Sequence, residues 1–274
     1  MSPRGSHSTY TAFWEHTGNR FPSLKGAPST DYYFDCERTL FQNYFPALRD
    51  LLLLKTDLWD EAKNTEILRW AAEQGARPVG IDIADSVVRQ ARAILRRHDP
   101  QCLVADVRAL PFRADAFDLV YSMGTIEHFP EYRTAIDEIY RVLKPGGRAI
   151  IGVPNKLDPF LRPLLVFLLQ AFGRYPYGRE RAFTPAALRR LLTDAGFRVT
   201  ALSGILFMPG WLRIADLWCH LRVPRLARLT GWLVRPFAWA YRRFPALRRH
   251  GYLLACVVVK PDGAASGLPP GKTR

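Results

Sequence analysis

Two aspartates each close a short apolar segment, and they stand one strand–helix unit apart. Asp82 lies near the end of RPVGIDIA (77–84), and Asp106 near the end of CLVADV (102–107). A carboxylate in the first position can accept hydrogen bonds from both hydroxyls of a ribose. In the second position, Asp106 could accept from an adenine amino group while the Val107 amide meets a ring nitrogen. The pair predicts adenosine binding. The structural alternatives are a helix cap for Asp82 and a local turn for Asp106.

A third candidate group follows the apolar segment FDLVYSM (117–123), where Glu127 and His128 open a helix. A histidine with a pKa near neutrality suits a general base, so His128 is the first candidate for a catalytic residue. Capping or packing at the start of the helix is the alternative role. Glu127, Tyr32 and Tyr33 are further candidates for the base.

Alternating strand and helix patterns position these residues. The pattern predicts strands at 51–57, 77–84, 102–107, 117–123, 148–154, 197–207 and 250–261, and helices at 64–73, 86–97, 132–143 and 184–197. LKPGG (143–147) is predicted to be a turn. Such alternation indicates an α/β fold with a doubly wound, mostly parallel sheet. Ligands of such sheets bind at the carboxyl ends of the strands, where the candidate residues lie.

The length of 274 residues allows one α/β domain with additions. We expect an irregular N-terminal leader with a helix near 37–44 (residues 1–45), a main domain at 46–261 and a disordered tail at 262–274. Within the main domain, 208–249 is a helical insertion before the last strand.

Taken in order, these segments resemble the class I S-adenosylmethionine-dependent methyltransferases, in particular the ubiquinone/menaquinone-type branch. GIDIADSVVRQAR, VADVRALPFRADAFDLVYS, IEHF and RVLKPGGRAIIGVPN carry the resemblance. It implies a Rossmann-like methyltransferase fold and S-adenosylmethionine as cofactor. It also implies a ribose contact by Asp82, an adenine contact by Asp106, and further cofactor contacts by Ile83, Val107 and Met123.

The loop after the first strand departs from that family. The family carries a glycine-rich loop here, whereas this chain has LLKTDLWDEAKNT, which contains no glycine. Asp57 or Glu61 could instead accept from the cofactor's ammonium group, and Trp59 could cover the sulfonium by a cation–π contact. A degenerate site is the alternative. A nicotinamide dehydrogenase is disfavoured more strongly, because its pyrophosphate depends on the glycine loop.

Composition limits the partners and the compartment. The net charge of +14 favours anionic partners, and the hydrophobic fraction of 48% argues against wholesale disorder. The four cysteines (36, 102, 219 and 256) show neither CxxC nor metal-ligand spacing, so we expect free thiols and no metal site. Without a signal-like segment or a long apolar run, the expected location is cytoplasmic, with peripheral attachment to the inner membrane face as an option.

The insertion combines charge with aromatic residues. Residues 211–250 contain nine arginines, no lysine and one acid, Asp216, interleaved with tryptophans and leucines. This pattern is typical of attachment to an anionic membrane surface, and equally of a helical cap over the active site. No nucleic-acid-binding module is recognisable, so a nucleic-acid partner is not expected. With the apolar segment 157–172, the insertion suggests a small hydrophobic or amphipathic, lipid-like acceptor. The alternative function is a non-catalytic, methyltransferase-like binding or scaffold protein.

Overall fold

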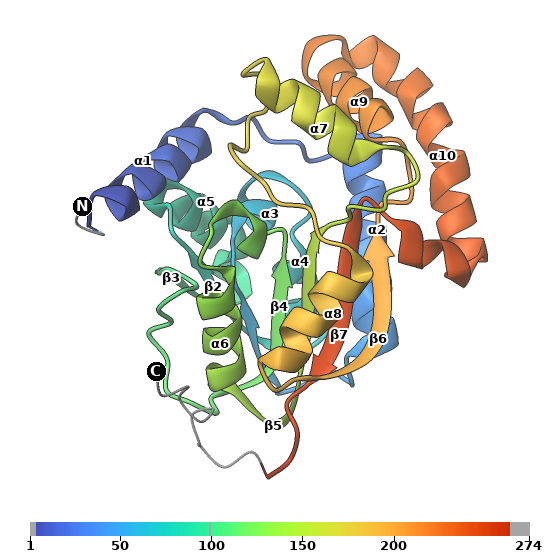
Figure 1. Cartoon of the computed structure of the whole chain (residues 1–274). Coiled ribbons are helices and arrows are strands. Elements are labelled where there is room, and N and C mark those ends of the chain that lie inside the picture. Colours follow the sequence, from blue (N-terminus) through green and yellow to red (C-terminus); the bar gives the residue numbers. More distant parts are fainter. Residues whose placement is uncertain (1–3, 99, 264–274) are drawn as a thin grey trace.

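The computed structural model describes residues 4–98 and 100–263, which form one sheet covered by helices (Figure 1). The strand order is β3-β2-β1-β4-β5-β7-β6. The first five strands pair in parallel, whereas β7 is antiparallel to both of its neighbours. The strands are β1 (Leu52–Lys55), β2 (Arg77–Asp82), β3 (Gln101–Val104), β4 (Phe117–Met123), β5 (Leu143–Pro154), β6 (Arg198–Ile205) and β7 (Leu253–Val259).

Helices cover both faces of this sheet. The α-helices are α1 (Arg4–Arg20), α2 (Pro28–Tyr44), α3 (Trp59–Lys63), α4 (Ile67–Glu73), α5 (Asp85–Leu95), α6 (Tyr132–Val142), α7 (Arg162–Ala171), α8 (Pro185–Asp194), α9 (Gly210–Arg222) and α10 (Ala227–Arg243). One core contains side chains of α2, α4, α5, α9 and α10, and the other contains those of α6 and α8. The doubly wound, mostly parallel α/β fold is thus confirmed.

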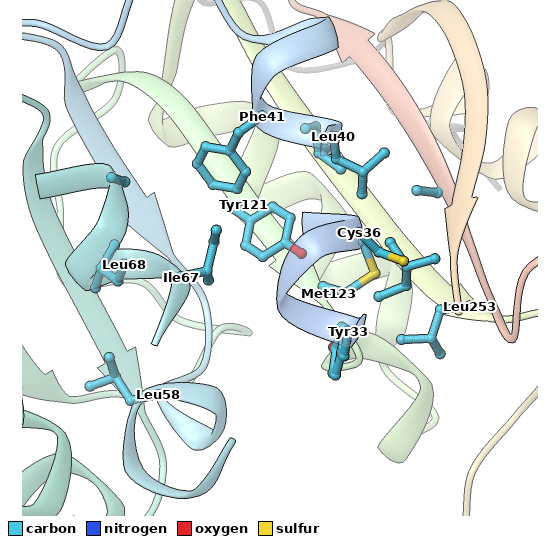
Figure 2. Close-up of a cluster of buried hydrophobic side chains, with 14 of the residues drawn as sticks. Tyr33, Cys36, Leu40, Phe41, Leu58, Ile67, Leu68, Tyr121, Met123 and Leu253 are labelled. Atoms are coloured by element: carbon cyan, nitrogen blue, oxygen red, sulfur yellow. The ribbon is translucent and has the colours of Figure 1, made fainter. Parts of the chain in front are cut away.

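Neighbouring residues of each strand supply the two cores, because side chains in a strand alternate between faces. Tyr121 of β4 enters the first core and Val120 enters the second. Figure 2 shows the first core, in which Leu40 and Phe41 of α2 lie beside Tyr121. The rings of Phe41 and Tyr121 have centroids 4.9 Å apart. The central strands β1 and β4 are therefore covered on both faces near the site.

Three local expectations differ from the structure. The leader is helical rather than irregular, since α1 covers residues 4–20 and α2 begins at Pro28, well before residue 37. The segment 143–147 belongs to β5, because Leu143 pairs with Phe117 and the register shifts where Gly146 has a φ of 73°. The glycine supplies a kink inside the strand rather than a turn before it. Of the predicted tail, 264–274 lies outside the described residues.

Residues 208–249 contain α9, the short 3₁₀ helix η3 (Pro224–Leu226), α10 and the beginning of η4 (Pro245–His250). Asp216 of α9, fully buried, fixes this segment to the fold. Its carboxylate accepts from the Ser29 amide of α2 at 2.8 Å and from the Thr230 hydroxyl of α10 at 2.6 Å. Within the described part of the chain, no helix has the length and apolarity to cross a membrane.

Candidate active site

A cavity of about 390 Å³ lies at the carboxyl ends of the strands. Its floor comes from residues that follow β1, β2, β3 and β4, and its walls from α1, α7, α9 and the segment 174–180. Six of the residues predicted to bind the cofactor line this cavity: Asp57, Asp82, Ile83, Asp106, Val107 and Met123. His128 lines it as well, whereas Glu61 does not.

Asp82 lies at the end of β2 and is only 8% exposed. Its carboxylate accepts from the Leu58 amide at 3.0 Å and from the Ala84 amide at 2.9 Å. Burial raises the pKa of Asp82 to about 7, although these two amides act to lower it. Each carboxylate oxygen has two lone pairs, so both oxygens keep an acceptor position beside their backbone bond. Asp82 thus combines a structural role with a place on the cavity wall.

Asp106 also has a protein partner. Arg108 donates to its carboxylate from Nε at 3.0 Å and from Nη2 at 2.7 Å, and the Arg108 amide donates at 2.8 Å. The guanidinium lies over the ring of Phe129, 4.8 Å from its centroid. The local turn considered for Asp106 therefore exists, and the side chain still borders the cavity.

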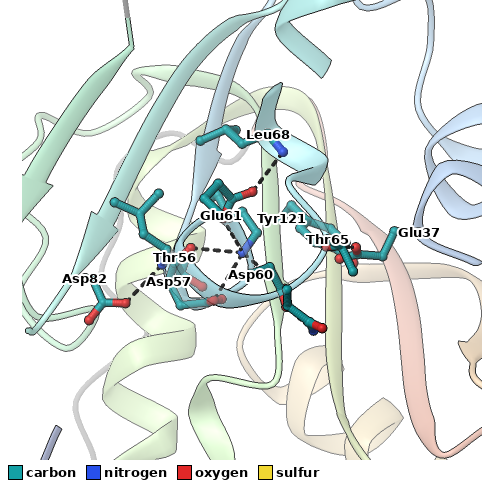
Figure 3. Close-up of polar contacts among 12 residues, drawn as sticks. Glu37, Thr56, Asp57, Asp60, Glu61, Thr65, Leu68, Asp82 and Tyr121 are labelled. Atoms are coloured by element: carbon teal, nitrogen blue, oxygen red, sulfur yellow. Dashed lines mark hydrogen bonds and ion pairs between the residues drawn. The ribbon is translucent and has the colours of Figure 1, made fainter. Parts of the chain in front are cut away.

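Lys55 organises the glycine-free loop after β1, whose acids Asp57, Asp60 and Glu61 lie close together in Figure 3. Its fully buried ammonium group lies 3.1 Å from Asp57 Oδ1, 3.4 Å from Asp60 Oδ2 and 3.2 Å from Glu61 Oε2. Burial acts to lower the pKa of Lys55, but these carboxylates outweigh it and raise that pKa well above its usual value. One cation thus holds three carboxylates, so the loop is built from side chains instead of exposed backbone.

Glu61 is the predicted cofactor residue that the structure does not bring to the cavity. Its carboxylate is fully buried, contacts Lys55 and accepts from the Leu68 amide at 2.8 Å in the first turn of α4. The sequence pattern shows an acid in the loop, but not that Lys55 draws it inward. The cofactor contact predicted for Glu61 is therefore wrong in this structure.

Asp57 and Asp60, in contrast, border the cavity. Asp57 Oδ2 accepts from the Thr125 hydroxyl at 3.0 Å, which links the end of β1 to the segment after β4. Burial raises the pKa of Asp60, and Lys55 acts against that shift. Together with Asp82, these acids give this end of the cavity an excess of carboxylates over cations. A cofactor that carries a sulfonium and an ammonium group has the complementary charge.

Aromatic rings close the cavity beside this acidic end. Trp59 packs edge-on against Trp14 at 6.0 Å, Phe21 at 5.0 Å and Tyr177 at 5.7 Å between ring centroids. All four rings border the cavity, and Trp14 comes from α1. The position of Trp59 agrees with a cation–π contact to a sulfonium. Sequence reasoning missed Trp14, because the leader showed no helical period.

His128 lies in the short 3₁₀ helix η2 (Ile126–His128) with a side chain that is 10% exposed. Its Nδ1 is 3.2 Å from the carbonyl of Arg179, and its ring packs edge-on against Trp14 at 5.0 Å. Because a carbonyl only accepts, Nδ1 donates and Nε2 keeps the lone pair of a base. Burial lowers the pKa of His128, which favours the neutral imidazole.

Glu127 is the buried acid next to this histidine. Its Oε1 is 3.8 Å from His128 Nε2, and its Oε2 is buried with no hydrogen-bond partner among the described residues. Burial, and then the carboxylate of Glu180, raise the pKa of Glu127 well above its usual value. Of the other candidates for a base, Tyr33 borders the cavity, while the hydroxyl of buried Tyr32 donates to the Phe207 carbonyl at 3.4 Å.

A further polar group, which the sequence did not indicate, lines the cavity close to Glu127. Arg162 of α7 is 2% exposed and forms an ion pair with Glu180. Its Nη2 donates to the Tyr175 hydroxyl at 3.2 Å, and its guanidinium lies 4.0 Å from the ring centroid of Tyr252. Arg162, Tyr175 and Glu180 belong to α7 and the segment after it, whereas Tyr252 is distant in sequence, so no helix or strand period predicts this group.

Comparisons with known proteins agree with this arrangement. Residues 64–151 match the family described as "Methyltransferase domain". A demethylmenaquinone methyltransferase of Thermus thermophilus is 34% identical over 143 residues, which cover 46% of this chain and 65% of that protein. A ubiquinone biosynthesis O-methyltransferase of Idiomarina loihiensis is 28% identical over 145 residues, covering 50% and 59%. The chain thus spans less than two thirds of these two relatives.

Solved structures extend the fold match to most of the chain. An S-adenosylmethionine-dependent methyltransferase from Mesorhizobium loti superposes with a TM-score of 0.55 at 18% identity, covering 86% of this chain and all of that one. The cyclase SpnF superposes with a TM-score of 0.56 at 21% identity, covering 84% and 82%. At such identities the likeness shows the fold and leaves the reaction open. Residues 64–151 thus match a methyltransferase domain, and the fold around them is that of solved S-adenosylmethionine-dependent methyltransferases.

Proposed function

We propose that the chain transfers a methyl group from S-adenosylmethionine to a small hydrophobic or amphipathic acceptor. One observation carries the proposal: a single cavity joins an acidic and aromatic end beside Asp82 and Asp106 to an apolar wall from α7 and α9. The sulfonium, ammonium and adenosine groups of the cofactor match the acidic and aromatic end, and an apolar acceptor matches the apolar wall.

The residues divide the work by position. Asp82 would hold the ribose, Asp106 and Val107 the adenine, and Asp57 the ammonium group, with Ile83 and Met123 packing around them. When bound, the cofactor supplies an activated methyl group, so the protein needs mainly to orient the acceptor and exclude water. The aromatic wall around Trp59 serves the exclusion of water. His128 Nε2 would accept a proton from an acceptor that must lose one.

The acceptor class rests on chemistry and on the relatives. Leu165, Val166 and Leu169 of α7 border the cavity, as does Leu217 of α9. The names of the two curated relatives refer to demethylmenaquinone and to ubiquinone biosynthesis. We therefore propose a lipid-like acceptor such as an isoprenoid quinone precursor. The chain would act in the cytoplasm, peripherally on an anionic membrane surface that 208–249 contacts.

Calorimetry with S-adenosylmethionine and S-adenosylhomocysteine tests the cofactor site. Wild type should bind both at micromolar concentration, and Asp82→Asn should weaken binding at least about tenfold, since it loses a charge-assisted acceptor of two hydroxyls. Asp85→Asn is the matched control, because Asp85 pairs with Arg89 on the exposed side of α5 and does not line the cavity.

A methyltransferase-like binding protein without activity is the second candidate. The hydrogen bonds from Arg108 to Asp106 favour this second candidate, since adenine would have to share that carboxylate with Arg108. Failure of the folded wild type to bind either compound at millimolar concentration would overturn the methyl-transfer proposal and leave this alternative.

A further inference from the structure

Helix α9 has a buried face and, opposite to it, an exposed apolar face. Leu212, Asp216 and Cys219 form the face buried against the rest of the fold. Trp211, Ile214, Trp218 and Leu221 recur every three or four residues on the opposite side, and each is at least 40% exposed. A surface helix packs through one face, so this exposed stripe has no partner in the described chain.

Helix α10 repeats the pattern. Thr230, Val234 and Tyr241 face inward and are buried. Leu229, Trp232 and Trp239 lie on the other side, and Trp232 is 70% exposed. On an α-helix these three residues share one face, because they lie three and seven residues apart. The structure thus presents a second exposed apolar stripe next to the first.

Helix α7 adds a third stripe, which Figure 1 places beside α9 at one end of the molecule. We define the apolar crown as the exposed side chains of these helices and their flanks: Leu161, Leu164, Phe167, Leu168, Phe172, Trp211, Ile214, Trp218, Leu221, Leu226, Leu229, Trp232, Leu233, Trp239 and Phe244. In the described residues, the other exposed large hydrophobics are only Phe13, Leu103, Val104 and Leu157. Clustering on this scale marks an interaction surface.

Charge around the crown selects the partner. From 211 to 250 there are nine arginines against one acid, and that acid, Asp216, is buried. Arg228 and Arg235 are exposed on α10, about two helical turns apart, along the flank of its apolar stripe. Tryptophan beside arginine suits the headgroup region of an anionic bilayer, where the rings lie at the interface and the guanidinium groups meet phosphates. Leucine and isoleucine stripes have no comparable use on nucleic acid.

The cavity reaches this same surface. Ile214 of α9 borders the cavity and is 47% exposed, so it belongs to both. Leu165 and Leu169 of α7 line the cavity, while Leu164 and Leu168, one residue earlier in each case, are exposed. The roof of the cavity is therefore the inner side of the crown.

From these observations we propose that the apolar crown docks on an anionic lipid bilayer and that the acceptor passes from the bilayer into the cavity beside Ile214, between α7 and α9. The entry route of the acceptor rests on the proposed methyl transfer, whereas the docking on the bilayer does not. An acceptor with a long apolar chain then never crosses water on its way to the site.

Flotation of the full chain with vesicles tests the docking. Phosphatidylcholine vesicles containing phosphatidylglycerol should bind at least about fivefold more protein than pure phosphatidylcholine vesicles, and added salt should reduce the difference. Brominated lipids should quench tryptophan fluorescence, because all four exposed tryptophans (211, 218, 232 and 239) belong to the crown.

Two sets of variants separate the apolar and the electrostatic contributions. Trp218→Gln/Trp232→Gln/Trp239→Gln should reduce vesicle binding at least about tenfold, whereas Leu103→Gln/Val104→Gln, exposed on β3, should not. Arg225→Gln/Arg228→Gln/Arg235→Gln should abolish the preference for anionic lipid. Arg189→Gln/Arg190→Gln/Arg198→Gln removes the same charge away from the crown and should keep it. Circular dichroism establishes that each variant is folded.

The docking proposal is wrong if the tryptophan variant co-floats with the vesicles as well as wild type does. The docking proposal is also wrong if lipid-free wild type forms a dimer that this variant abolishes, because the crown would then bind a second copy.

The entry route is tested with labelled S-adenosylmethionine and a total lipid extract of the source membranes. The tryptophan variant should lose methyl transfer from vesicles at least about tenfold but keep it from detergent-dispersed lipid. Equal loss in both overturns the route, and absence of transfer by wild type in both refutes the methyl transfer itself.

Discussion

Lys55 shows how one side chain replaces a missing backbone motif. Lys55→Met should lower the free energy of unfolding at pH 7 by about 3–5 kcal/mol, because it leaves buried carboxylates of Asp57, Asp60 and Glu61 without their cation. Urea denaturation measures this loss. Lys156→Met, at an exposed position, is the control and should change stability by less than about 0.5 kcal/mol. Equal stability of the two variants would contradict the role of Lys55.

His128 permits a kinetic prediction once an acceptor is known. His128→Gln should lower kcat by about two orders of magnitude if the acceptor must lose a proton, while the affinity for S-adenosylmethionine stays within about twofold. Because burial lowers the pKa of His128, the wild-type rate should be constant around neutral pH and fall only in acid. A pH–rate profile checks this, and a variant with wild-type kcat would remove His128 from the reaction.

Individual site residues differed in how far the sequence could predict them. Asp57, Asp82 and Asp106 reach the cavity because the period of the strands fixes where each strand ends. Glu61 could not be placed, since its direction depends on a lysine buried by tertiary packing. The polar group around Arg162 and Glu180 joins α7 to the loop that follows it, and no helix or strand period predicts such a contact.

At the scale of elements, Asp216 holds two helices to a third. Asp216→Ala should destabilise the protein by about 1–3 kcal/mol, since the Ser29 amide and the Thr230 hydroxyl lose a buried acceptor. Hydrogen exchange should accelerate first in α9 and α10 and leave the sheet protected. Asp194→Ala, at an exposed position at the end of α8, provides the control. Uniform acceleration across the sheet would show that the helices are not a separate unit.

The order of the elements was predictable, and their ends were less so. Apolar runs indicate all seven strands, because strands that pack against helices need apolar side chains whether they pair parallel or antiparallel. The leader escaped prediction since α1 gains its order from contacts with α5, where Glu15 accepts from the Ser86 amide at 3.1 Å. The start of β5 was missed because a proline and two glycines usually end a strand, yet here they form a kink within it.

Across the whole molecule, buried acids should make stability depend on pH. Burial raises the pKa of Asp82 to about 7. The protonated carboxyl group therefore contributes fully to the free energy of unfolding below about pH 4, and this contribution is lost as the pH rises to 7. The loss is about 1.4 kcal/mol per pH unit in that window. Burial also raises the pKa values of Asp60 and Glu61, so these acids change the pH dependence of stability in the same direction. Burial lowers the pKa of His128, which changes it in the opposite direction.

Comparison with Asp82→Asn isolates this effect. Between pH 5 and 7 the variant should lose less stability than wild type, by about 1.4 kcal/mol per unit, in urea titrations at each pH. Saturating S-adenosylmethionine should raise the Tm of wild type more at pH 8 than at pH 5.5, because the ionised carboxylate is the better acceptor. Parallel pH profiles of variant and wild type would contradict the buried, raised Asp82.

The place of β7 has a consequence for synthesis on the ribosome. Because β7 lies between β5 and β6, β5 lacks its second neighbour and β6 its only neighbour until residues 253–259 have emerged. The nascent chain therefore carries two open strand edges, together with the whole of α9 and α10, while it waits for its last seven-residue strand. In that interval the growing polypeptide is most exposed to aggregation, and a chaperone would find its binding surface there.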